Sequence, residues 1–348
     1  MAENNILSGL RVSELEQKME DIGEKSFRAH QIYKWINKKA VHDFHKMTDL
    51  SKDLREKLDG MFRIKTLTIK NKEQSKIDGS IKYLFELADG NFIESVLMTE
   101  DGRRTICLST MVGCPIGCPY CATGLMGLKR NLTAGEIVEQ LLWVAKDGDT
   151  NITNVVFMGM GEPFLNYENS IKAAQIFNTE RGPEISTRKI VISTSGIVPK
   201  IYRYSEEGHK FKLAISLNAT TDEQRDYMVP INKKYPLGEL LKAAKHYSEG
   251  ARDRVTFEYI LIKDFNDSVK DARRLRKMLS DFPCKINIIP YNENDMLDFK
   301  APSEQNLNRF VKELYKSPFA VTVRHSKGQD ISAACGQLYN EALQKETE

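Results

Sequence analysis

VGCPIGCPYCATG, residues 112–124, is the stretch that decides the fold. Cys114, Cys118 and Cys121 stand there at C-x3-C-x2-C spacing. Thiolates bind soft metals and iron–sulfur clusters. Because a 4Fe–4S cluster has four irons, three cysteines leave one iron open to another ligand. The glycines and prolines of the stretch favour a tight loop over a helix or strand. The stretch therefore predicts a loop that wraps a compact metal centre.

The same cysteines could also form most of a structural zinc site, with a fourth ligand elsewhere. No histidine lies nearby, and no second C-x2-C pair completes a four-ligand set. The spacing, with an aromatic residue before the last cysteine, is similar to the signature of the radical S-adenosylmethionine (SAM) superfamily. In that superfamily SAM ligates the open iron. The motif alone leaves both alternatives open.

The composition fits a large barrel with a small accessory domain. The chain has 348 residues, of which 41% are apolar, and its net charge of +3 is too small to indicate a nucleic-acid partner by itself. The N-terminus lacks a basic region followed by an apolar run, so we expect neither a signal peptide nor a membrane span. The six cysteines are unevenly spaced, unlike a secreted disulfide framework. We therefore expect a cytoplasmic protein.

Four regions are expected along the chain. They are an N-terminal helical accessory domain that binds RNA (1–75), a β-meander linker (76–99), a core barrel (100–335) and a C-terminal helix or tail (336–348). The first region is rich in lysine and arginine, and a capping-box pattern from Ser13 to Glu16 predicts the start of its first helix. Asp-Gly dipeptides at 78–79, 89–90 and 101–102 predict the turns of the meander.

Strands and helices then alternate from the cysteine loop to about residue 324. This order predicts an α/β fold with a parallel sheet and right-handed crossovers. Six such units make a partial (β/α)6 barrel, whose functional residues should follow the carboxyl ends of the strands. Small polar residues, a glycine, a carboxylate and the leucine between Ser216 and Asn218 occur at those places, where a ribose, an adenine and an ammonium group could be held. They are Gly161, Glu162, Ser193, Ser216, Leu217, Asn218 and Asn292.

Two further cysteines lie outside the loop and have either a packing or a chemical role. Cys107 is on the strand that enters the loop, and Cys335 lies near the C-terminus. Cys335 is expected at the start of a last helix, where it is either a small buried residue or a thiolate activated as a nucleophile. Cys284 is assigned to core packing.

With these motifs the chain resembles the RlmN/Cfr family of radical SAM RNA adenine methyltransferases, and its RlmN branch more closely. The resemblance covers nearly the whole chain. It is carried by the cysteine loop together with four further segments: FRAHQIYKWI (27–36), NVVFMGMGEP (154–163), VTFEY (255–259) and DISAACGQL (330–338).

The resemblance implies a role for each candidate residue. Cys114, Cys118 and Cys121 would hold the 4Fe–4S cluster, and the seven strand-end residues would contact SAM. Cys335 would carry the methyl group, Cys107 would act as general base and resolve the intermediate, and Glu94 would accept a proton. One departure is Asn218, where many members have histidine.

The resemblance also implies a reaction that consumes two SAM molecules per turnover. The first methylates Cys335, and the second yields a 5′-deoxyadenosyl radical that takes hydrogen from that methyl group. The methylene radical adds to the base, and resolution leaves a Cys107–Cys335 disulfide to be reduced again. The implied substrates are the peptidyl-transferase-centre adenine of 23S rRNA, methylated at carbon 2, and an adenine beside the tRNA anticodon.

We expect a monomer that binds no membrane and receives electrons from a donor such as flavodoxin or ferredoxin. Two alternatives remain. One is methylation of the same adenine at carbon 8, as in the Cfr branch, which confers antibiotic resistance. The other is a zinc-stabilised RNA-binding protein without catalysis.

Overall fold

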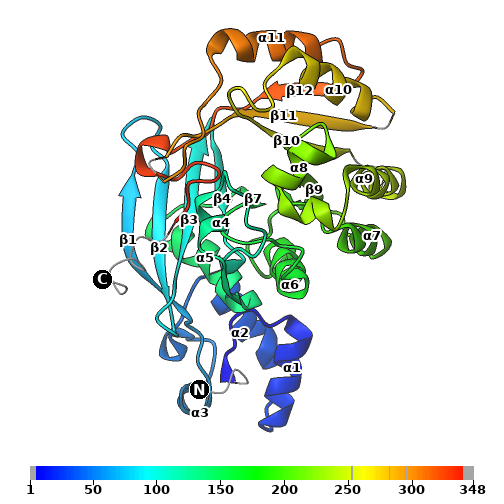
Figure 1. The fold of residues 1–348 in the computed structure, drawn as a ribbon. Coiled ribbons are helices and arrows are strands. Elements are labelled where there is room, and N and C mark those ends of the chain that lie inside the picture. The colour runs from blue at the N-terminus through cyan, green and yellow to red at the C-terminus, as the bar shows by residue number, and fades with distance from the viewer. Residues whose placement is uncertain (1–4, 252–253, 282, 295, 340–348) are drawn as a thin grey trace.

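The structure is a computed structural model that describes residues 5–251, 254–281, 283–294 and 296–339. The N-terminal helices are α1 (Val12–Asp21), α2 (Phe27–Asn37) and α3 (Lys52–Met61). They pack through buried residues such as Met19, Ile32 and Leu58, and they lie at one end of the molecule (Figure 1). The expected cap at Ser13 is wrong, because the cap residue of α1 is Arg11, two residues earlier, and the Glu14 carboxylate accepts the backbone N–H of Arg11.

An antiparallel meander joins these helices to the barrel. Its strands are β1 (Leu67–Gln74), β2 (Ile81–Leu87) and β3 (Phe92–Glu100), and β3 pairs with β4 (Arg103–Cys107). The three Asp-Gly turns lie between these strands, and each glycine has a positive φ. Strand β1 was not predicted, because most of its side chains are exposed and it lacks an apolar alternation. The expected linker boundary at residue 75 therefore falls at the end of β1.

The main sheet closes into a partial barrel. From β4 onward its neighbours are parallel and follow chain order. The strands are β7 (Asn154–Phe157), β8 (Ile190–Thr194), β9 (Lys212–Ser216), β10 (Val255–Leu261), β11 (Cys284–Pro290) and β12 (Ala320–Val323). Among the described residues six strand–helix units precede β12, so the predicted partial barrel is confirmed.

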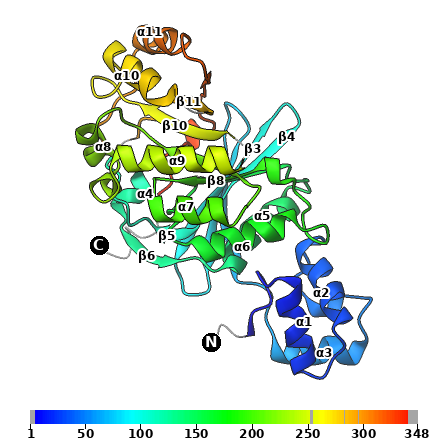
Figure 2. The same cartoon turned by 90° about the vertical axis from the view of Figure 1, so that its right-hand side faces the viewer.

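Helices cover the outer face of the parallel strands (Figure 2). They are α5 (Ala134–Asp147), α6 (Tyr167–Asn178), α7 (Val198–Glu206), α8 (Asp222–Met228), α9 (Leu237–Ala251), α10 (Val269–Leu279) and α11 (Glu304–Leu314). Among the described residues, none of the helices combines the length and apolar character that crossing a membrane requires.

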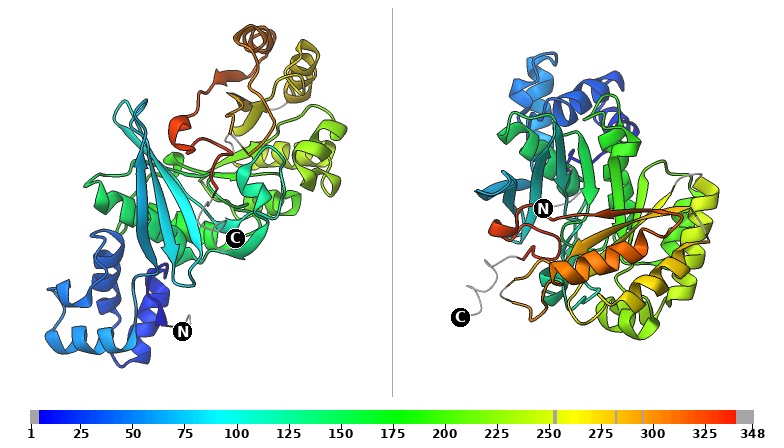
Figure 3. Two further views of the ribbon diagram at one scale, coloured as in Figure 1. Left: turned by 60° about the vertical axis from the view of Figure 1, so that its left-hand side comes forward. Right: turned by 90° about the horizontal axis from the view of Figure 1, so that it is seen from above.

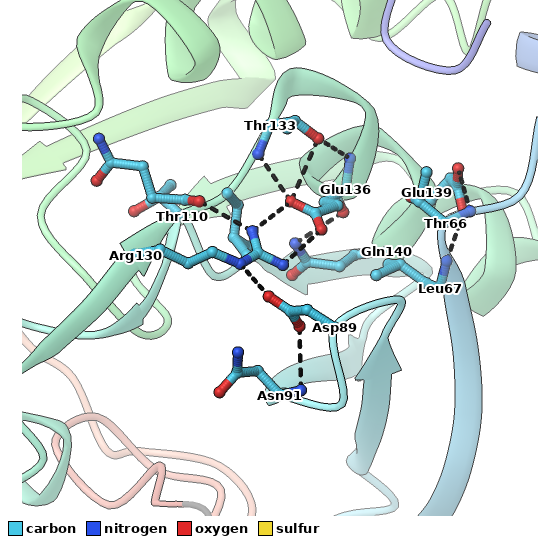
Figure 4. Close-up of polar contacts among 12 residues, drawn as sticks. Thr66, Leu67, Asp89, Asn91, Thr110, Arg130, Thr133, Glu136, Glu139 and Gln140 are labelled. Carbon is cyan, nitrogen blue, oxygen red and sulfur yellow. Dashed lines mark hydrogen bonds and ion pairs between the residues drawn. The ribbon is translucent and has the colours of Figure 1, made fainter. Parts of the chain in front are cut away.

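Helix α5 links the barrel to the meander (Figure 4). Its predicted capping box is present, since Thr133 accepts the N–H of Glu136 and Glu136 accepts that of Thr133. Arg130, on β6 (Leu128–Asn131), bridges the carboxylates of Glu136 and Asp89. Farther along α5, the buried Glu139 accepts the backbone N–H of Thr66 at 2.8 Å, where β1 begins. The helix thereby fixes the meander beside the barrel.

The segment after β12 passes between the meander and the far strands of the sheet (Figures 1 and 3). Asp78 in the β1–β2 turn accepts the N–H of Gly328 at 2.7 Å, and Asp330 accepts the hydroxyl of Ser75 at 2.7 Å. These reciprocal contacts tie the segment to the meander, so the open side of the barrel is covered by the part of the chain that carries Cys335.

Candidate active site

The cysteine loop is held at its base by a short hairpin. Strand β5 (Met111–Gly113) pairs with β6, and the N–H of Cys114 donates to the carbonyl of Gly127 at 2.8 Å. Gly113 has φ of +76°, and a Cβ there would lie 1.9 Å from the carbonyl oxygen of Gly127. Only glycine fits this position. The loop ends in the single turn α4 (Ala122–Leu125).

The three loop thiols lie close enough to influence one another. Burial raises the pKa of Cys118 well above its usual value, and the charges of Cys121 and Cys114 raise it further. Burial likewise raises the pKa of Cys114 to about 12. Metal binding favours the thiolate form and so offsets the free-energy cost of ionising these buried thiols. Three buried thiols spaced along one loop therefore match the donor set of an iron–sulfur cluster with one open iron.

In the described part of the chain, no three His, Cys, Asp or Glu side chains converge as the ligands of a single metal ion do. A four-iron cluster is a larger body whose thiolate ligands stand around its corners. The fit to a cluster therefore rests on the spacing and burial of the three loop cysteines.

Gly161 and Glu162 follow β7 and border the loop. Gly161 has φ of +102°, and a Cβ there would lie 2.6 Å from that of Met111, so a side chain is excluded. Glu162 is buried, and its two carboxylate oxygens accept the N–H groups of Phe164 at 2.9 Å and Ser195 at 2.6 Å. Burial raises the pKa of Glu162, and these N–H groups oppose the rise. Glu162 thus joins the ends of β7 and β8 beside the loop.

Asn218 and Asn292, both predicted to contact SAM, use their side chains on protein partners in this structure. The amide of Asn218 donates to the hydroxyl of Tyr120 at 2.7 Å and accepts the N–H of Ile260 at 2.9 Å. It therefore connects the cysteine loop to β10. The amide nitrogen of Asn292 donates to the carbonyl of Cys335 at 3.1 Å. The other predicted contacts, Ser193, Ser216 and Leu217, lie at the same carboxyl ends of the strands.

Arg225 of α8 belongs to this site and was missed in the sequence. It is fully buried, and its guanidinium donates to the carbonyl oxygens of Ser195 at 2.6 Å, Ser216 at 3.1 Å and Leu217 at 3.1 Å. Burial lowers its pKa to about 10, and the nearby Tyr120, Cys118 and Asp222 oppose this decrease. Arg225 holds the ends of β8 and β9 together. Nothing in its local sequence distinguishes it from a surface arginine.

Cys335 lies beside the cysteine loop. The carbonyl of the next residue, Gly336, accepts the N–H of Ala122 at 2.7 Å, and the hydroxyl of Thr123 donates to the carbonyl of Leu338 at 2.6 Å. The expectation of a helix at Cys335 is wrong. The segment forms the 3-10 turn Gln329–Ile331 and then further turns up to residue 337, and residues 340–348 lie outside the described range. Within the described residues no helix begins at Cys335, so the expected activation of this thiol by its own helix N-terminus does not apply.

Cys107 and Glu94 face the same interior. Burial raises the pKa of Cys107 to about 12, and the charge of Cys335 contributes to the rise, so the two thiols are near each other. All six cysteines are free thiols in the described structure. Glu94 is buried and not a solvent-facing strand carboxylate; it accepts the N–H of Tyr339 at 3.0 Å and lies 3.4 Å from the Nζ of Lys82. Burial raises its pKa to about 7, against the opposing effect of Lys82.

Comparison with known proteins agrees with this site. The ribosomal RNA large subunit methyltransferase N-terminal domain matches residues 5–64, and the radical SAM superfamily matches residues 108–276. A probable dual-specificity RNA methyltransferase RlmN of Pseudothermotoga lettingae is 46% identical over 96% of this chain and 97% of its own length. The dual-specificity RNA methyltransferase RlmN of Geobacter sulfurreducens is 46% identical over 95% of this chain and 91% of its own.

Among solved structures, a radical SAM methyltransferase from Sphaerobacter thermophilus superposes with a TM-score of 0.92. It is 43% identical and covers 96% of this chain and 98% of its own. The family resemblance found in the sequence is confirmed, and a non-catalytic zinc protein is not supported. The chain belongs to the RlmN family of radical SAM methyltransferases.

Proposed function

We propose that this protein methylates carbon 2 of an adenine in 23S rRNA, and of an adenine in tRNA, through a methylated cysteine. The observation that carries the proposal is the position of Cys335. A segment far away in sequence brings this thiol against the cysteine loop and near Cys107. A methyltransferase that transferred the methyl group directly from SAM would need neither of these cysteines.

Some residues of the site hold the cofactors, and others carry the methyl group or accept a proton. When bound, the 4Fe–4S cluster and two SAM molecules supply a methyl group for a thiol and a 5′-deoxyadenosyl radical. Cys114, Cys118 and Cys121 hold the cluster, and the strand-end residues with Asn292 hold SAM. Cys335 presents the methyl group to the base. Cys107 accepts the proton from the base. After this proton has left Cys107, its thiolate sulfur bonds to the sulfur of Cys335, the bond from that sulfur to the methylene carbon breaks, and the carbon takes up a proton to become the product's methyl group.

We also propose that the protein is a cytoplasmic monomer and that it receives electrons from a donor such as flavodoxin or ferredoxin. The donor supplies the electron that starts radical formation, and reduction of the Cys107–Cys335 disulfide restores both thiols. The accessory helices would bind RNA, and they carry many of the chain's cations.

The role proposed for Glu94 predicts how the rate of methylation depends on pH. A proton acceptor works only when ionised, and the pKa of Glu94 is about 7 because of burial. Methylation should therefore rise with pH up to about 7 and then level off, and Glu94→Gln should be slow without this rising limb. Glu139→Gln is the matched control, since burial raises the pKa of Glu139 to about 7 in a helix outside the site. A pH–rate profile of both variants tests this role. If the rate of Glu94→Gln still rises with pH up to about 7, Glu94 is not the proton acceptor.

Cations on α2 and just beyond its C-terminal end should contribute to RNA affinity. Lys34 and Lys39 are exposed, and the Nζ of Lys39 lies 3.3 Å from the centre of the Trp35 ring. Replacing both lysines with alanine should weaken RNA binding and lower the slope of log affinity against log salt by about 2 if each meets one phosphate. SAM cleavage should not change. Lys52→Ala is the control, because this lysine lies 3.9 Å from Glu56. If the slope of log affinity against log salt is the same for the variant and the wild type, these lysines do not contact RNA.

Anaerobic turnover tests the proposed function. The reconstituted enzyme is incubated with SAM, a reductant and a 23S rRNA fragment, and the digested nucleosides are compared with standards by mass spectrometry. We expect 2-methyladenosine. Formation of 8-methyladenosine would place the activity with the Cfr branch, and 5′-deoxyadenosine without any methylated adenosine would reject this RNA as the substrate.

A further inference from the structure

Glu258 is a buried carboxylate inside the barrel that the site described above does not use. It lies on β10, in register with Ser216 of β9 and Asn287 of β11. The next residue, Tyr259, packs against Phe310 of α11 with ring centres 5.7 Å apart. Because neighbouring side chains of a strand point to opposite faces, Glu258 faces the barrel interior. Only 7% of it is exposed.

One of its two oxygens has a partner and the other does not. The amide of Asn287 donates to Oε1 at 2.9 Å. The buried Oε2 has no hydrogen-bond partner among the described residues. Buried polar atoms are rarely left unpaired, because losing water without a replacement is costly. Burial raises the pKa of Glu258, whereas Arg324 favours its ionised form.

The position of Glu258 relative to Cys335 indicates what its free oxygen meets. Burial raises the pKa of the Cys335 thiol, Arg324 lowers it, and the charge of Glu258 raises it. Strand β11, which pairs with β10 beside Glu258, leads to Asn292, whose amide donates to the carbonyl of Cys335 at 3.1 Å. Glu258 and Cys335 therefore face one interior. A base that receives a methyl group from Cys335 has to lie against that sulfur, and so within this space.

We propose that Oε2 of Glu258 accepts an N–H from the exocyclic amino group of the target adenine, which makes Glu258 a specificity-determining residue. The inference rests on the proposed function. A carboxylate oxygen accepts from the amino group of adenine, whereas guanine carries an acceptor oxygen at the same ring position. A site built around such a hydrogen bond discriminates strongly against a base that lacks the donor. SAM carries the same amino group, so the test has to separate the two adenines.

The experiment compares two RNA fragments, one with adenosine at the target and one with purine ribonucleoside, which lacks the amino group. Wild type, Glu258→Ala and Glu258→Gln are assayed for methylation of each RNA, for SAM affinity by calorimetry and for 5′-deoxyadenosine formation. In Glu258→Gln, the amide of Asn287 should still donate to the side-chain oxygen of the glutamine. The NH2 group of the glutamine then takes the place of Oε2, so a donor replaces the free acceptor. Thr256→Val is the control, because Thr256 is buried one inward-facing position earlier on the same strand.

We expect wild type and Thr256→Val to prefer the adenosine RNA by at least about tenfold in kcat/KM. Both Glu258 variants should lose this preference by slowing on adenosine RNA alone, with SAM affinity within about twofold of wild type. Equal slowing on both RNAs, an unchanged preference, or weakened SAM binding would overturn the inference. If wild type forms 5′-deoxyadenosine but methylates neither RNA, the proposed function itself fails.

Discussion

Replacing Cys335 with alanine should lower the rate of RNA methylation by at least about 10³-fold, because the variant lacks the sulfur that we propose carries the methyl group. Cys335 lies beside the cysteine loop, where Asn292 holds its carbonyl. SAM should still bind. Methylated nucleosides measured by mass spectrometry give the rate. Cys284→Ala is the matched control, since Cys284 is buried on β11 and its thiol donates to the Leu279 carbonyl at 3.6 Å. It should cost stability and leave methylation near the wild-type rate.

Cys107→Ala separates the two reactive thiols. In the proposed mechanism Cys107 resolves the link between Cys335 and the base, so without it a covalent protein–RNA complex should accumulate and survive denaturing gel electrophoresis. The double variant Cys107→Ala/Cys335→Ala should form none. Normal turnover of Cys107→Ala would exclude a resolving role for Cys107. Methylation by Cys335→Ala near the wild-type rate would exclude Cys335 as the methyl carrier.

Replacing Arg225 with methionine should have the second largest effect, because it removes the hydrogen bonds that join β8 to β9. The carbonyl oxygens of Ser195 and Leu217, in buried hydrogen bonds, and that of Ser216, in a partly buried one, would lose this donor. Each buried acceptor left unpaired costs about 1–3 kcal/mol, so unfolding in urea should show a loss of about 3 kcal/mol or more. SAM affinity should fall as well, because these strand ends carry its proposed contacts.

Arg225→Lys and Arg203→Met complete this test. Lysine keeps the charge but lacks the planar fork of donors, so it should restore only part of the stability and SAM affinity. Arg203, on α7, pairs with Glu207 at the surface, and its replacement should change neither. If Arg225→Met binds SAM as wild type does, Arg225 does not position the SAM site.

The parts of the fold that repeat a local pattern could be predicted from the sequence. The cysteine spacing located the loop, the pair Thr133 and Glu136 located the start of α5, and alternating strands and helices indicated the parallel barrel. These signals work because hydrogen bonds of loops, caps and crossovers are made between residues close in sequence.

The features that depend on long-range burial could not be predicted. Arg225 and Glu258 look like surface charges in the sequence, and only the closed barrel buries them. Strand β1 has no apolar alternation, because it lies at the edge of the sheet with most of its side chains in solvent. A run of turns stands at Cys335 in place of the expected helix. Local backbone bonds such as Gln337 N–H to the Ala334 carbonyl close these turns, while the Gly336 carbonyl accepts from the cysteine loop and the Cys335 carbonyl accepts from Asn292.

The most direct test of the central claim is the mass of the Cys335 peptide after the reconstituted protein has been incubated with SAM alone. The methyl group should be found as a thioether on Cys335, with Cys107 and Cys284 unmodified. In the Cys335→Ala variant no peptide should gain it. A wild-type protein that methylates RNA while its Cys335 peptide is never methylated would contradict the account.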